Sequence, residues 1–460
     1  MYLATTGRRD APPAPSGARR RVSRTVLALG AVSLVTDVSS EMVTAVLPLY
    51  LVVGLGLSPL QFGFLDGLFH GATALVRIAG GQFADRAGRA KTVAGFGYAL
   101  SACSRLGLLL AGGAAAGIAA ALAADRLGKG IRTAPRDALI SLNSPPDGLG
   151  RAFGVHRAMD TTGALLGPLV AFALLWATAD AYDAVFVVSF AVGLVGVLLL
   201  VAAVPADAPR PPRPRGNGRP RIEGSRAAGR GPFATGPAAS RAFRRLLAAT
   251  ALLGAATVGD AFLYLLLQRR YDLAVTWFPL LPLGAAAVYL LLAVPAGRLA
   301  DRFGRRRPFL YGHLALLAGY GLLLLAPEGG TGAAPVLVVA LVLALLGVFY
   351  AATDGVLMAL AGPLLHRERR AGGLAVVQTV QALARLVAAT GFGAAWTLWG
   401  PGPALALALA ALAAAALCAS RLLPRTDTAP PDTPSQDSAS PASPASPAPP
   451  PAVPSEGFSS

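Results

Sequence analysis

Several Asp and Glu residues lie within long apolar stretches of this chain, and their carboxyl groups are the side chains best suited to proton transfer. Asp37 and Glu41 lie four residues apart in one such stretch, with Ser39 and Ser40 between them. This spacing places both carboxyl groups on the same face of a helix. Asp37 lies about 18 Å along its stretch, and Asp260 lies at a comparable depth in a later one. Burial in a medium of low dielectric favours the neutral form of a carboxyl group, so such groups can bind and release protons near neutral pH.

The composition indicates that lipid surrounds most of the chain. Of the 460 residues, 54% are hydrophobic and 14% are charged, whereas soluble proteins have about 25% charged residues. The apolar stretches are long enough for helices that cross a hydrocarbon core of about 30 Å. We therefore expect an all-α integral membrane protein with twelve transmembrane helices in two six-helix bundles. The predicted helices are 25–53, 59–83, 92–111, 114–133, 153–177, 183–204, 245–267, 276–298, 308–326, 335–360, 372–397 and 402–423.

The basic residues predict the sidedness of these helices. The net charge is +17, and the cations are concentrated in alternate loops and in the tails. Because cytoplasmic loops carry the excess of Lys and Arg, we expect a multi-pass protein of the cell (inner) membrane with both termini in the cytoplasm. The predicted regions are a disordered cytoplasmic tail (1–24), an N-terminal bundle (25–204), a cytoplasmic linker (205–244), a C-terminal bundle (245–423) and a second disordered cytoplasmic tail (424–460).

Further polar residues lie at helical spacing within the predicted membrane helices. Ionisable groups in lipid are costly, so they face a water-filled cavity or pair with one another. We expect the following set to line a cavity and to bind protons or substrate, and for each carboxyl group a structural ion pair is the alternative. The set is Asp37, Glu41, Asp66, His70, Asp160, Asp260, Gln378 and Gln381, and Asp354 and Arg385 are further polar residues of this kind.

A charged motif occurs twice, each time between two apolar stretches. Residues 81–91 and 297–307 both read G-x-x-x-D-R-x-G-R-x-[KR], which indicates two related halves of one architecture. Simple positive anchors would need neither the glycines nor the aspartate, so we interpret the motif as a gating contact, with anchoring as the alternative. The gating residues are Gly81, Asp85, Arg86, Gly88 and Arg89 in the first copy, and Gly297, Asp301, Arg302, Gly304 and Arg305 in the second.

Arg126 lies well inside the fourth apolar stretch. An arginine within the hydrocarbon costs about 2.5–3.5 kcal/mol, so it should have an acidic partner. Asp125, Asp85 and Asp37 are the candidates, and we include Arg126 among the gating partners. For Arg132 and Arg136, which follow Arg126 in the sequence, anchoring at the headgroups is an equal alternative.

Small residues recur in the fifth apolar stretch. Gly163 and Gly167 are four residues apart, which makes a flat face for close helix contact. Pro168 follows directly and bends the helix by removing one backbone hydrogen bond. Together with Gly154 these residues form a packing signature, for which an ordinary helix seam is the alternative.

These motifs resemble those of the major facilitator superfamily, over residues 25–423. The two D-R-x-G-R motifs resemble the superfamily's loop between its second and third helices and a weaker copy between the eighth and ninth. Arg126-x-x-Lys129-Gly130 resembles its R-x-x-Q-G element, with Lys in place of Gln. Stretches 34–50 and 130–140 resemble one bacterial subgroup, whose signature specifies no substrate.

The fifth stretch is similar to a signature of the drug:proton antiporter branch. Gly154, Gly163, Gly167 and Pro168 fit the pattern G-x(8)-G-x(3)-G-P, although its closing pair of small residues appears here as Ala171 and Phe172. The resemblance implies two bundles around a central cavity lined by the first and seventh helices. It also implies that the loop after the second helix latches that helix onto the eleventh, and that release of this latch accompanies the opening of the cytoplasmic side.

The sequence therefore predicts a secondary active transporter that works by alternating access. The leading hypothesis is proton-coupled efflux, by antiport, of a small organic compound. Asp37 and Glu41 would carry the proton, and Asp85 and Arg126 would belong to the gate. One alternative is uptake of a small metabolite by proton symport or facilitated diffusion. Another is a sensor or scaffold with a transporter fold that moves no substrate.

Other chemistry finds no support in the sequence. We expect no enzyme, because no nucleophile and base pair and no metal-ligand set is visible. The chain has no G-x-x-x-x-G-K-[ST] motif, so we expect no nucleotide and no cofactor, with the proton gradient as the energy source. The expected partners are a small-molecule substrate and the lipid bilayer, without nucleic acid, and the protein is expected to be a monomer.

Overall fold

Every regular element that the structure describes is a helix. The structure, a computed structural model, describes residues 22–69, 90–144, 149–205, 241–329, 332–365 and 370–423, all within a unit that spans residues 1–427. In these residues, nine helices are long and apolar enough to cross a membrane. The all-α membrane architecture is thereby confirmed, and the count of twelve spans stays a prediction.

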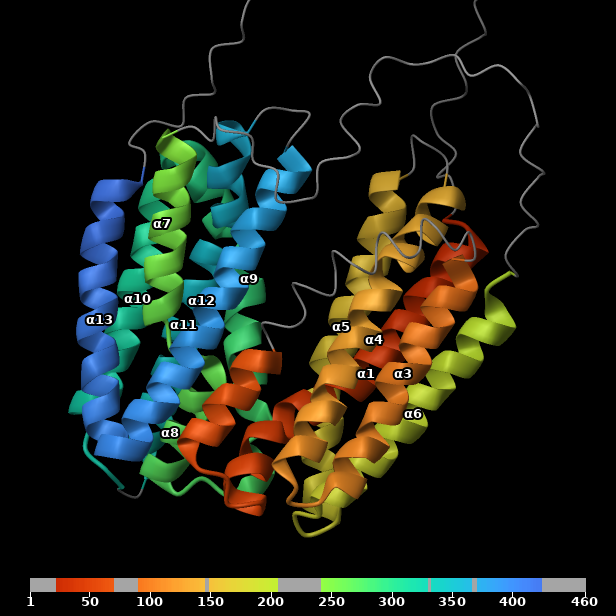
Figure 1. The fold of residues 1–460 in the computed structure, drawn as a ribbon, viewed down its shortest axis with the longest axis horizontal. Coiled ribbons are helices and arrows are strands. Elements are labelled where there is room, and N and C mark those ends of the chain that lie inside the picture. The colour runs from red at the N-terminus through yellow and green to blue at the C-terminus, as the bar shows by residue number, and fades with distance from the viewer. Residues whose placement is uncertain are drawn as a thin grey trace, which may run out of the picture. The chain divides into compact units, whose positions relative to one another are not determined.

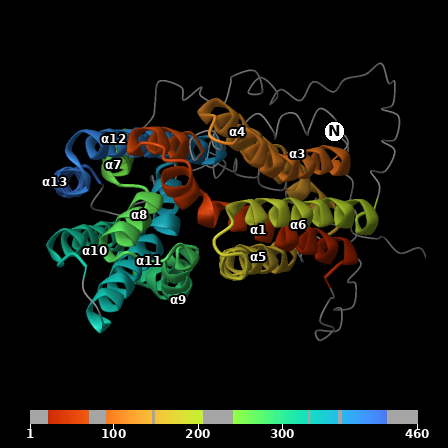
Figure 2. The ribbon, with the colours of Figure 1, turned by 90° about the horizontal axis from the view of Figure 1, so that it is seen from below.

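The first half of the chain forms one group of packed helices. In it α1 lies against α5 and α6, and α3 lies against α4 and α6 (Figures 1 and 2). Ser23 caps the start of α1 by accepting a hydrogen bond from the Val26 amide. The elements are α1 (Arg24–Leu49), the π-helical turn η1 (Tyr50–Gly54), a helical segment at 59–69, α3 (Ala90–Ala111), α4 (Ala115–Leu142), α5 (Leu149–Ala177) and α6 (Tyr182–Ala203).

The second half repeats the helix pairing of the first. Here α7 lies against α12 and α13, and α10 lies against α11 and α13 (Figures 1 and 2). With α7 as the counterpart of α1 and α10 as that of α3, these are the same four pairs. The elements are α7 (Arg241–Ala256), α8 (Asp260–Tyr271), η4 (Val275–Trp277), α9 (Leu280–Phe303), α10 (Arg306–Leu325), α11 (Ala333–Ala361), η5 (Gly362–Leu364), α12 (Arg370–Trp399) and α13 (Pro401–Leu422).

The seventh apolar stretch is broken, although the sequence predicted one helix over 245–267. The helix stops after Ala256 and resumes at Asp260, with Gly259 in an extended conformation. The backbone amide of Val258 donates to the hydroxyl of Tyr320 at 2.8 Å instead of bonding within a helix. This contact from α10 satisfies a backbone group that the break would otherwise leave unpaired in a buried region. The break places Asp260 in the first turn of α8.

Close backbone approaches hold the first group of helices together. Gly97 of α3 and Gly128 of α4 face each other, and a Cβ atom on either would lie 2.7 or 2.6 Å from the carbonyl oxygen of the other. Only glycine allows two helix backbones to approach to this distance, as in small-residue contacts between membrane helices.

Contacts between the two halves connect the segment 59–69 and the end of α5 with the second half. The Leu60 amide donates to the hydroxyl of Thr397 at 3.0 Å, and the Thr276 hydroxyl donates to Asp180 at 2.9 Å. The rings of Phe62 and Phe262 pack edge to face, with centroids 4.9 Å apart. α1 begins at Arg24. All three contacts lie toward the other end of the helices, away from Arg24.

Candidate functional site

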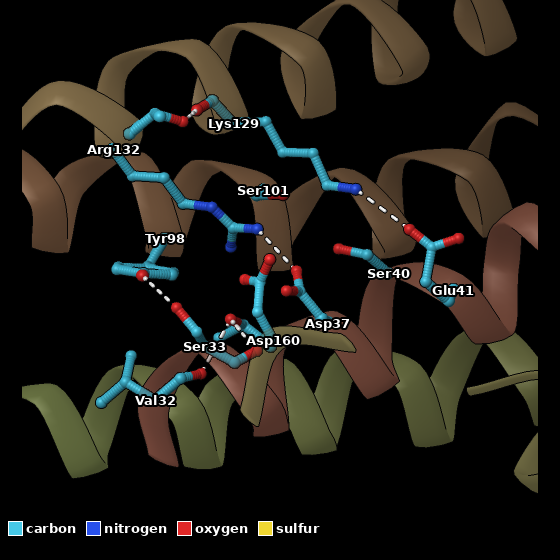
Figure 3. A network of polar contacts seen from close by, with 12 residues as sticks. Val32, Ser33, Asp37, Ser40, Glu41, Tyr98, Ser101, Lys129, Arg132 and Asp160 are labelled. Atoms are coloured by element: carbon cyan, nitrogen blue, oxygen red, sulfur yellow. Dashed lines mark hydrogen bonds and ion pairs between the residues drawn. The ribbon is translucent and has the colours of Figure 1, made fainter. Parts of the chain in front are cut away.

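Asp37 and Glu41 of α1 face two cations of α4 (Figure 3). Arg132 donates to the Asp37 carboxylate at 3.1 Å, and Lys129 donates to that of Glu41 at 3.3 Å. The two acids are four residues apart on α1, and the two cations are three residues apart on α4. The two ion pairs therefore connect successive turns of the two helices. The Arg132 side chain is 5% exposed and that of Lys129 is 18% exposed. Loss of charge on either acid would leave a cation uncompensated in a buried place.

Asp160 brings α5 into the same network, and Figure 3 shows it beside Asp37. Its carboxylate lies 3.7 Å from a guanidinium nitrogen of Arg136 on α4. Arg136 also donates to the Ser33 hydroxyl at 3.4 Å, and that hydroxyl lies 2.9 Å from Nε2 of His156. Three helices thus share one chain of polar contacts inside the first bundle.

Arg126 pairs with Asp125, its neighbour on α4. Asp125 is one of the three candidate partners considered from the sequence, and another of them, Asp85, lies outside the described residues. Asp125 also binds Arg105 of α3 at 3.0 Å, a residue that the sequence reasoning missed. The signal was present, because Arg105 is a charge within a predicted membrane helix. The Arg126 guanidinium stacks over the ring of Phe69 at 3.6 Å, which is a cation–π contact.

A cavity of about 440 Å³ is lined by residues of both halves. Glu41 belongs to its wall, so the ion-pair network of the first bundle reaches the cavity there. Asp37 and Asp160, which the sequence placed on the cavity, are not among the residues that line it, because their side chains turn toward Arg132 and Arg136 inside the bundle. Among the described residues of the cavity wall, the acids and bases other than tyrosine are Glu41, Asp66, Asp260, Asp354 and Arg385.

Asp260 organises the polar part of the cavity that the second half contributes. The Tyr350 hydroxyl donates to its two carboxylate oxygens at 2.5 and 2.6 Å. Arg385 of α12 lines a smaller space of about 80 Å³ together with Asp66 and Asp260, and another of about 50 Å³ together with Asp354. Its guanidinium therefore belongs to the same polar region as these three acids.

The two predicted glutamines of α12 lie in different surroundings. Gln381 lines a smaller cavity of about 50 Å³, together with Asp354 and Arg385. Gln378 is exposed on the same helix. Gln381 thus lies near Asp354 and Arg385, and no described contact brings Gln378 to them.

The comparison with protein families identifies this arrangement. The protein-family sequence model described as Major Facilitator Superfamily matches residues 29–288 and again residues 280–456 of this chain. The chain belongs to the major facilitator superfamily. It is a multi-pass membrane transporter of this type, as the resemblance of its motifs predicted.

Relatives and solved structures agree with this family. The chain is 26% identical over 386 residues to an uncharacterized MFS-type transporter of Methanocaldococcus jannaschii, which covers 82% of this chain and 90% of the relative. It is 34% identical over 161 residues to an uncharacterized protein of Mycobacterium tuberculosis, covering 35% and 38%.

Two crystal structures have a similar fold. One is a mutant of the nucleoside transporter NupG, with a TM-score of 0.71, 14% identity, and coverage of 87% of this chain and 100% of that one. The other is a bacterial homolog of the human lysosomal transporter Spinster, inward-facing and occupied, with a TM-score of 0.65, 17% identity, and coverage of 88% and 96%. At these identities the similarity concerns the fold alone.

The repeated superfamily motif is described only in its second copy. Gly297 lies in α9, and a Cβ there would meet nothing within 4 Å in the part of the chain that the structure describes, so no described helix packs closely against it. Gly304 ends α9 with a φ of 84°, a conformation that favours glycine. Arg305 donates to the carbonyl oxygen of Ala359 at 2.9 Å, a contact within the second half. Asp301 and Arg302 belong to the last turn of α9, and His70, Gly81, Asp85, Arg86, Gly88 and Arg89 lie outside the described residues.

The glycines of the fifth-helix signature pack α5 against α1. A Cβ on Gly163 would lie 2.3 Å from the carbonyl oxygen of Leu34, and one on Gly167 would lie 2.7 Å from Cβ of Glu41. These contacts flank the turn of α1 that carries Asp37. A Cβ on Gly154 would meet no atom within 4 Å among the described residues, so no described neighbour packs against this member of the signature. Pro168 lines the cavity.

Gly163→Ala is expected to destabilise the protein by about 1–3 kcal/mol, the usual cost of overpacking. The added methyl group would collide with backbone that cannot move aside without shifting α1. Gly154→Ala is the matched control on the same helix, and we expect it to be neutral or slightly stabilising. Thermal unfolding of both purified variants measures the difference. Equal transition temperatures would contradict a packing role for Gly163.

Proposed function

We propose that this superfamily member is a proton-coupled antiporter that exports a small organic compound by alternating access. The observation that carries the proposal is the position of Glu41. Glu41 lines the 440 Å³ cavity, and its carboxylate pairs with Lys129 at 3.3 Å. One turn away, Asp37 makes the equivalent pair with Arg132. Charges in the cavity therefore act directly on Glu41, which lies one turn from Asp37 on α1.

Proton uptake by these acids would change the packing of α1 on α4. A neutral Asp37 or Glu41 no longer balances its cation, and an unbalanced buried charge costs several kcal/mol. The chain can lower that cost by moving α4 relative to α1, which would reshape the cavity wall. Release of the proton would restore the pairs. This cycle links the protonation state to the conformation, as an exchanger requires.

The contacts between the halves support alternating access. Leu60 with Thr397, and Asp180 with Thr276, join the halves toward the end of the helices opposite Arg24. Each is a small polar contact near a turn, so rocking of the halves can break it at low cost. We propose that this end faces away from the cytoplasm and that Asp85 and Arg126 belong to the gate at the other end.

The proposed topology adds three membrane crossings to the nine candidate spans found in the described residues. The segment that begins at 59, α4 and α12 would bring the number of crossings to twelve, with both termini in the cytoplasm and the protein in the inner membrane. The charges of α4 pair within the bundle, which removes the main objection to placing it in lipid. We further propose that the protein acts as a monomer, without enzymatic activity, nucleotide or cofactor.

Two other functions remain alternatives to antiport. A sensor or scaffold would be favoured by closed ion pairs without a cavity; the pairs are closed, but the cavity is present and Glu41 lines it. Proton symport or facilitated uptake would use the same residues in a different order of binding. The departure of Ala171 and Phe172 from the antiporter signature leaves these uptake modes open.

A resistance and metabolite screen in an efflux-deficient host tests the proposal. Cells that express the protein should tolerate at least one toxic organic compound better than cells with the empty vector, or should release one metabolite faster. The variant Asp37→Asn should lose this effect. Higher sensitivity to a compound on expression would instead indicate uptake, and no effect on any compound would favour the sensor.

A further inference from the structure

A groove of about 240 Å³ lies on the surface of the second half, where α7, α12 and α13 meet. Every described residue that lines it is Ala, Gly, Val, Leu or Phe. Ala388 and Phe392 form part of its floor and are buried, whereas Val387 and Leu407 are 61% and 52% exposed at its rim. The groove is therefore open to the surroundings of the protein, and its described lining offers them no polar side chain.

The surroundings of the groove are lipid. α7 and α13 belong to candidate membrane spans, and on α12 the groove extends from Val387 to Ala395. This helix ends at Trp399, so these positions lie about 6–18 Å from its end at 1.5 Å per residue. Trp399 is 59% exposed, as is usual for aromatic residues at a membrane surface. The groove therefore begins just below the membrane surface and extends toward the middle of the hydrocarbon.

The helix break before Asp260 contributes one wall of the groove. Where α7 and α12 are still in contact, a Cβ on Gly254 would lie 2.8 Å from Cβ of Ala384. α7 ends two residues later, at Ala256, and both Ala256 and Val258 line the groove. Val258 also lines the space of about 80 Å³ that contains Asp260. An occupant of the groove therefore contacts a residue that also borders the acidic region.

A cation lies beside the end of the groove that is nearer to the membrane surface. The exposed Arg269 places its guanidinium 5.4 Å from the centroid of the Trp396 ring, and Trp396 follows Ala395 of the groove on α12. The neighbouring Arg270 pairs with Glu328, whereas no acid among the described residues forms an ion pair with Arg269. A guanidinium group at this level is suited to phosphate, which it binds through two parallel hydrogen bonds.

We propose that the groove binds one acyl chain of a membrane phospholipid, whose phosphate group is held by Arg269. Water is a poor occupant, because the lining offers it no hydrogen-bonding side chain. An empty groove would leave the lining atoms without dispersion contacts, and hydrocarbon is the material at this depth that restores them. Seated against Val258, the chain supports the break that places Asp260 in the cavity wall. The site lies apart from that cavity, so the inference does not depend on the direction or the coupling of transport.

Photo-crosslinking of the full-length protein in liposomes tests the proposal. The liposomes consist of phosphatidylethanolamine and phosphatidylglycerol, with a trace of phosphatidylglycerol that carries a diazirine in the middle of one acyl chain. After irradiation, mass spectrometry of peptides locates the labelled residues. Ala411 and Ala413 are both exposed on α13, and Ala411 lines the groove whereas Ala413 does not. We expect several-fold more label on Ala411, and equal labelling of the two alanines would overturn the proposal, because it would show only general contact with lipid.

Gly391→Leu is expected to remove this preference for Ala411. A Cβ on Gly391 would meet no atom within 4 Å among the described residues, so a leucine side chain fits into the groove and takes the place of the acyl chain. Gly321→Leu is the matched control and should keep the preference, because Gly321 is a glycine of α10 with the same open space, outside the groove. Full retention of the label in Gly391→Leu would contradict the acyl-chain site. If a variant does not fold, the comparison of Ala411 with Ala413 in the wild-type protein still decides.

Arg269→Gln tests the phosphate contact. It should lower the label on Ala411 about two- to fivefold, the range for an exposed ion pair. With a diacylglycerol probe, which has the same diazirine chain and no phosphate, the variant and the wild type should be labelled alike. An unchanged label with the phospholipid probe would overturn the role of Arg269.

Discussion

Asp37→Asn is expected to abolish transport driven by a pH gradient. Asparagine has nearly the shape of aspartate, but it can neither carry the negative charge nor release a proton. Arg132, which donates to Asp37 at 3.1 Å, would then remain without its carboxylate in every step of the cycle. Inverted membrane vesicles with an acidic interior measure the effect, using the compound that the resistance screen identifies. Wild-type vesicles should accumulate this compound, and those with the variant should not.

A second variant separates loss of coupling from loss of folding. Asp183→Asn removes an exposed acid at the start of α6 and should keep the wild-type rate. Exchange of labelled for unlabelled compound, without a gradient, should persist in Asp37→Asn if the protein is folded and only the proton step is lost. Undiminished accumulation in Asp37→Asn would remove Asp37 from the mechanism.

Asp125→Asn is expected to cost about 3–5 kcal/mol in the free energy of unfolding. Asp125 pairs with Arg105 at 3.0 Å and also with Arg126. The three side chains are buried, so the variant would leave two guanidinium groups in the bundle without a carboxylate. Titration of the purified protein with a denaturing detergent, followed by circular dichroism, measures the change.

The control for this prediction is on the same helix. Asp137 pairs with Arg136 at 3.1 Å, but its side chain is 43% exposed. Asp137→Asn should therefore change stability by no more than about 0.5 kcal/mol. A similar loss of unfolding free energy in both variants would show that burial of the Asp125 ion pairs adds nothing to the stability of the protein.

The sequence predicted the membrane helices and the polar face of α1, because hydropathy and helical spacing depend on local residues. It did not predict which cations would face Asp37 and Glu41. That choice depends on the rotation of α4 about its axis, which distant packing decides. The sequence also predicted that both Asp37 and Glu41 line the cavity. In the structure Glu41 lines it, whereas Asp37 points into the first bundle toward Arg132.

The helix break before Asp260 also depends on contacts between distant residues, which the sequence alone did not predict. Isolated glycines in an apolar stretch are compatible with a continuous helix, and the stretch 245–267 contains two, Gly254 and Gly259. The break is stabilised by the hydroxyl of Tyr320, which comes from a different helix. The glycine signature of α5 was predictable in part, since Gly163 and Gly167 pack closely on α1 and Gly154 does not.

The direction of proton movement tests the central claim most directly. The purified protein is reconstituted into liposomes that contain a pH-sensitive dye, and the compound identified by the screen is added outside without an imposed gradient. Entry of the compound in exchange for protons should raise the lumenal pH, and Asp37→Asn should prevent that rise. A fall in lumenal pH would show symport, and entry of the compound without any pH change would show that protons play no part; either result would contradict the account.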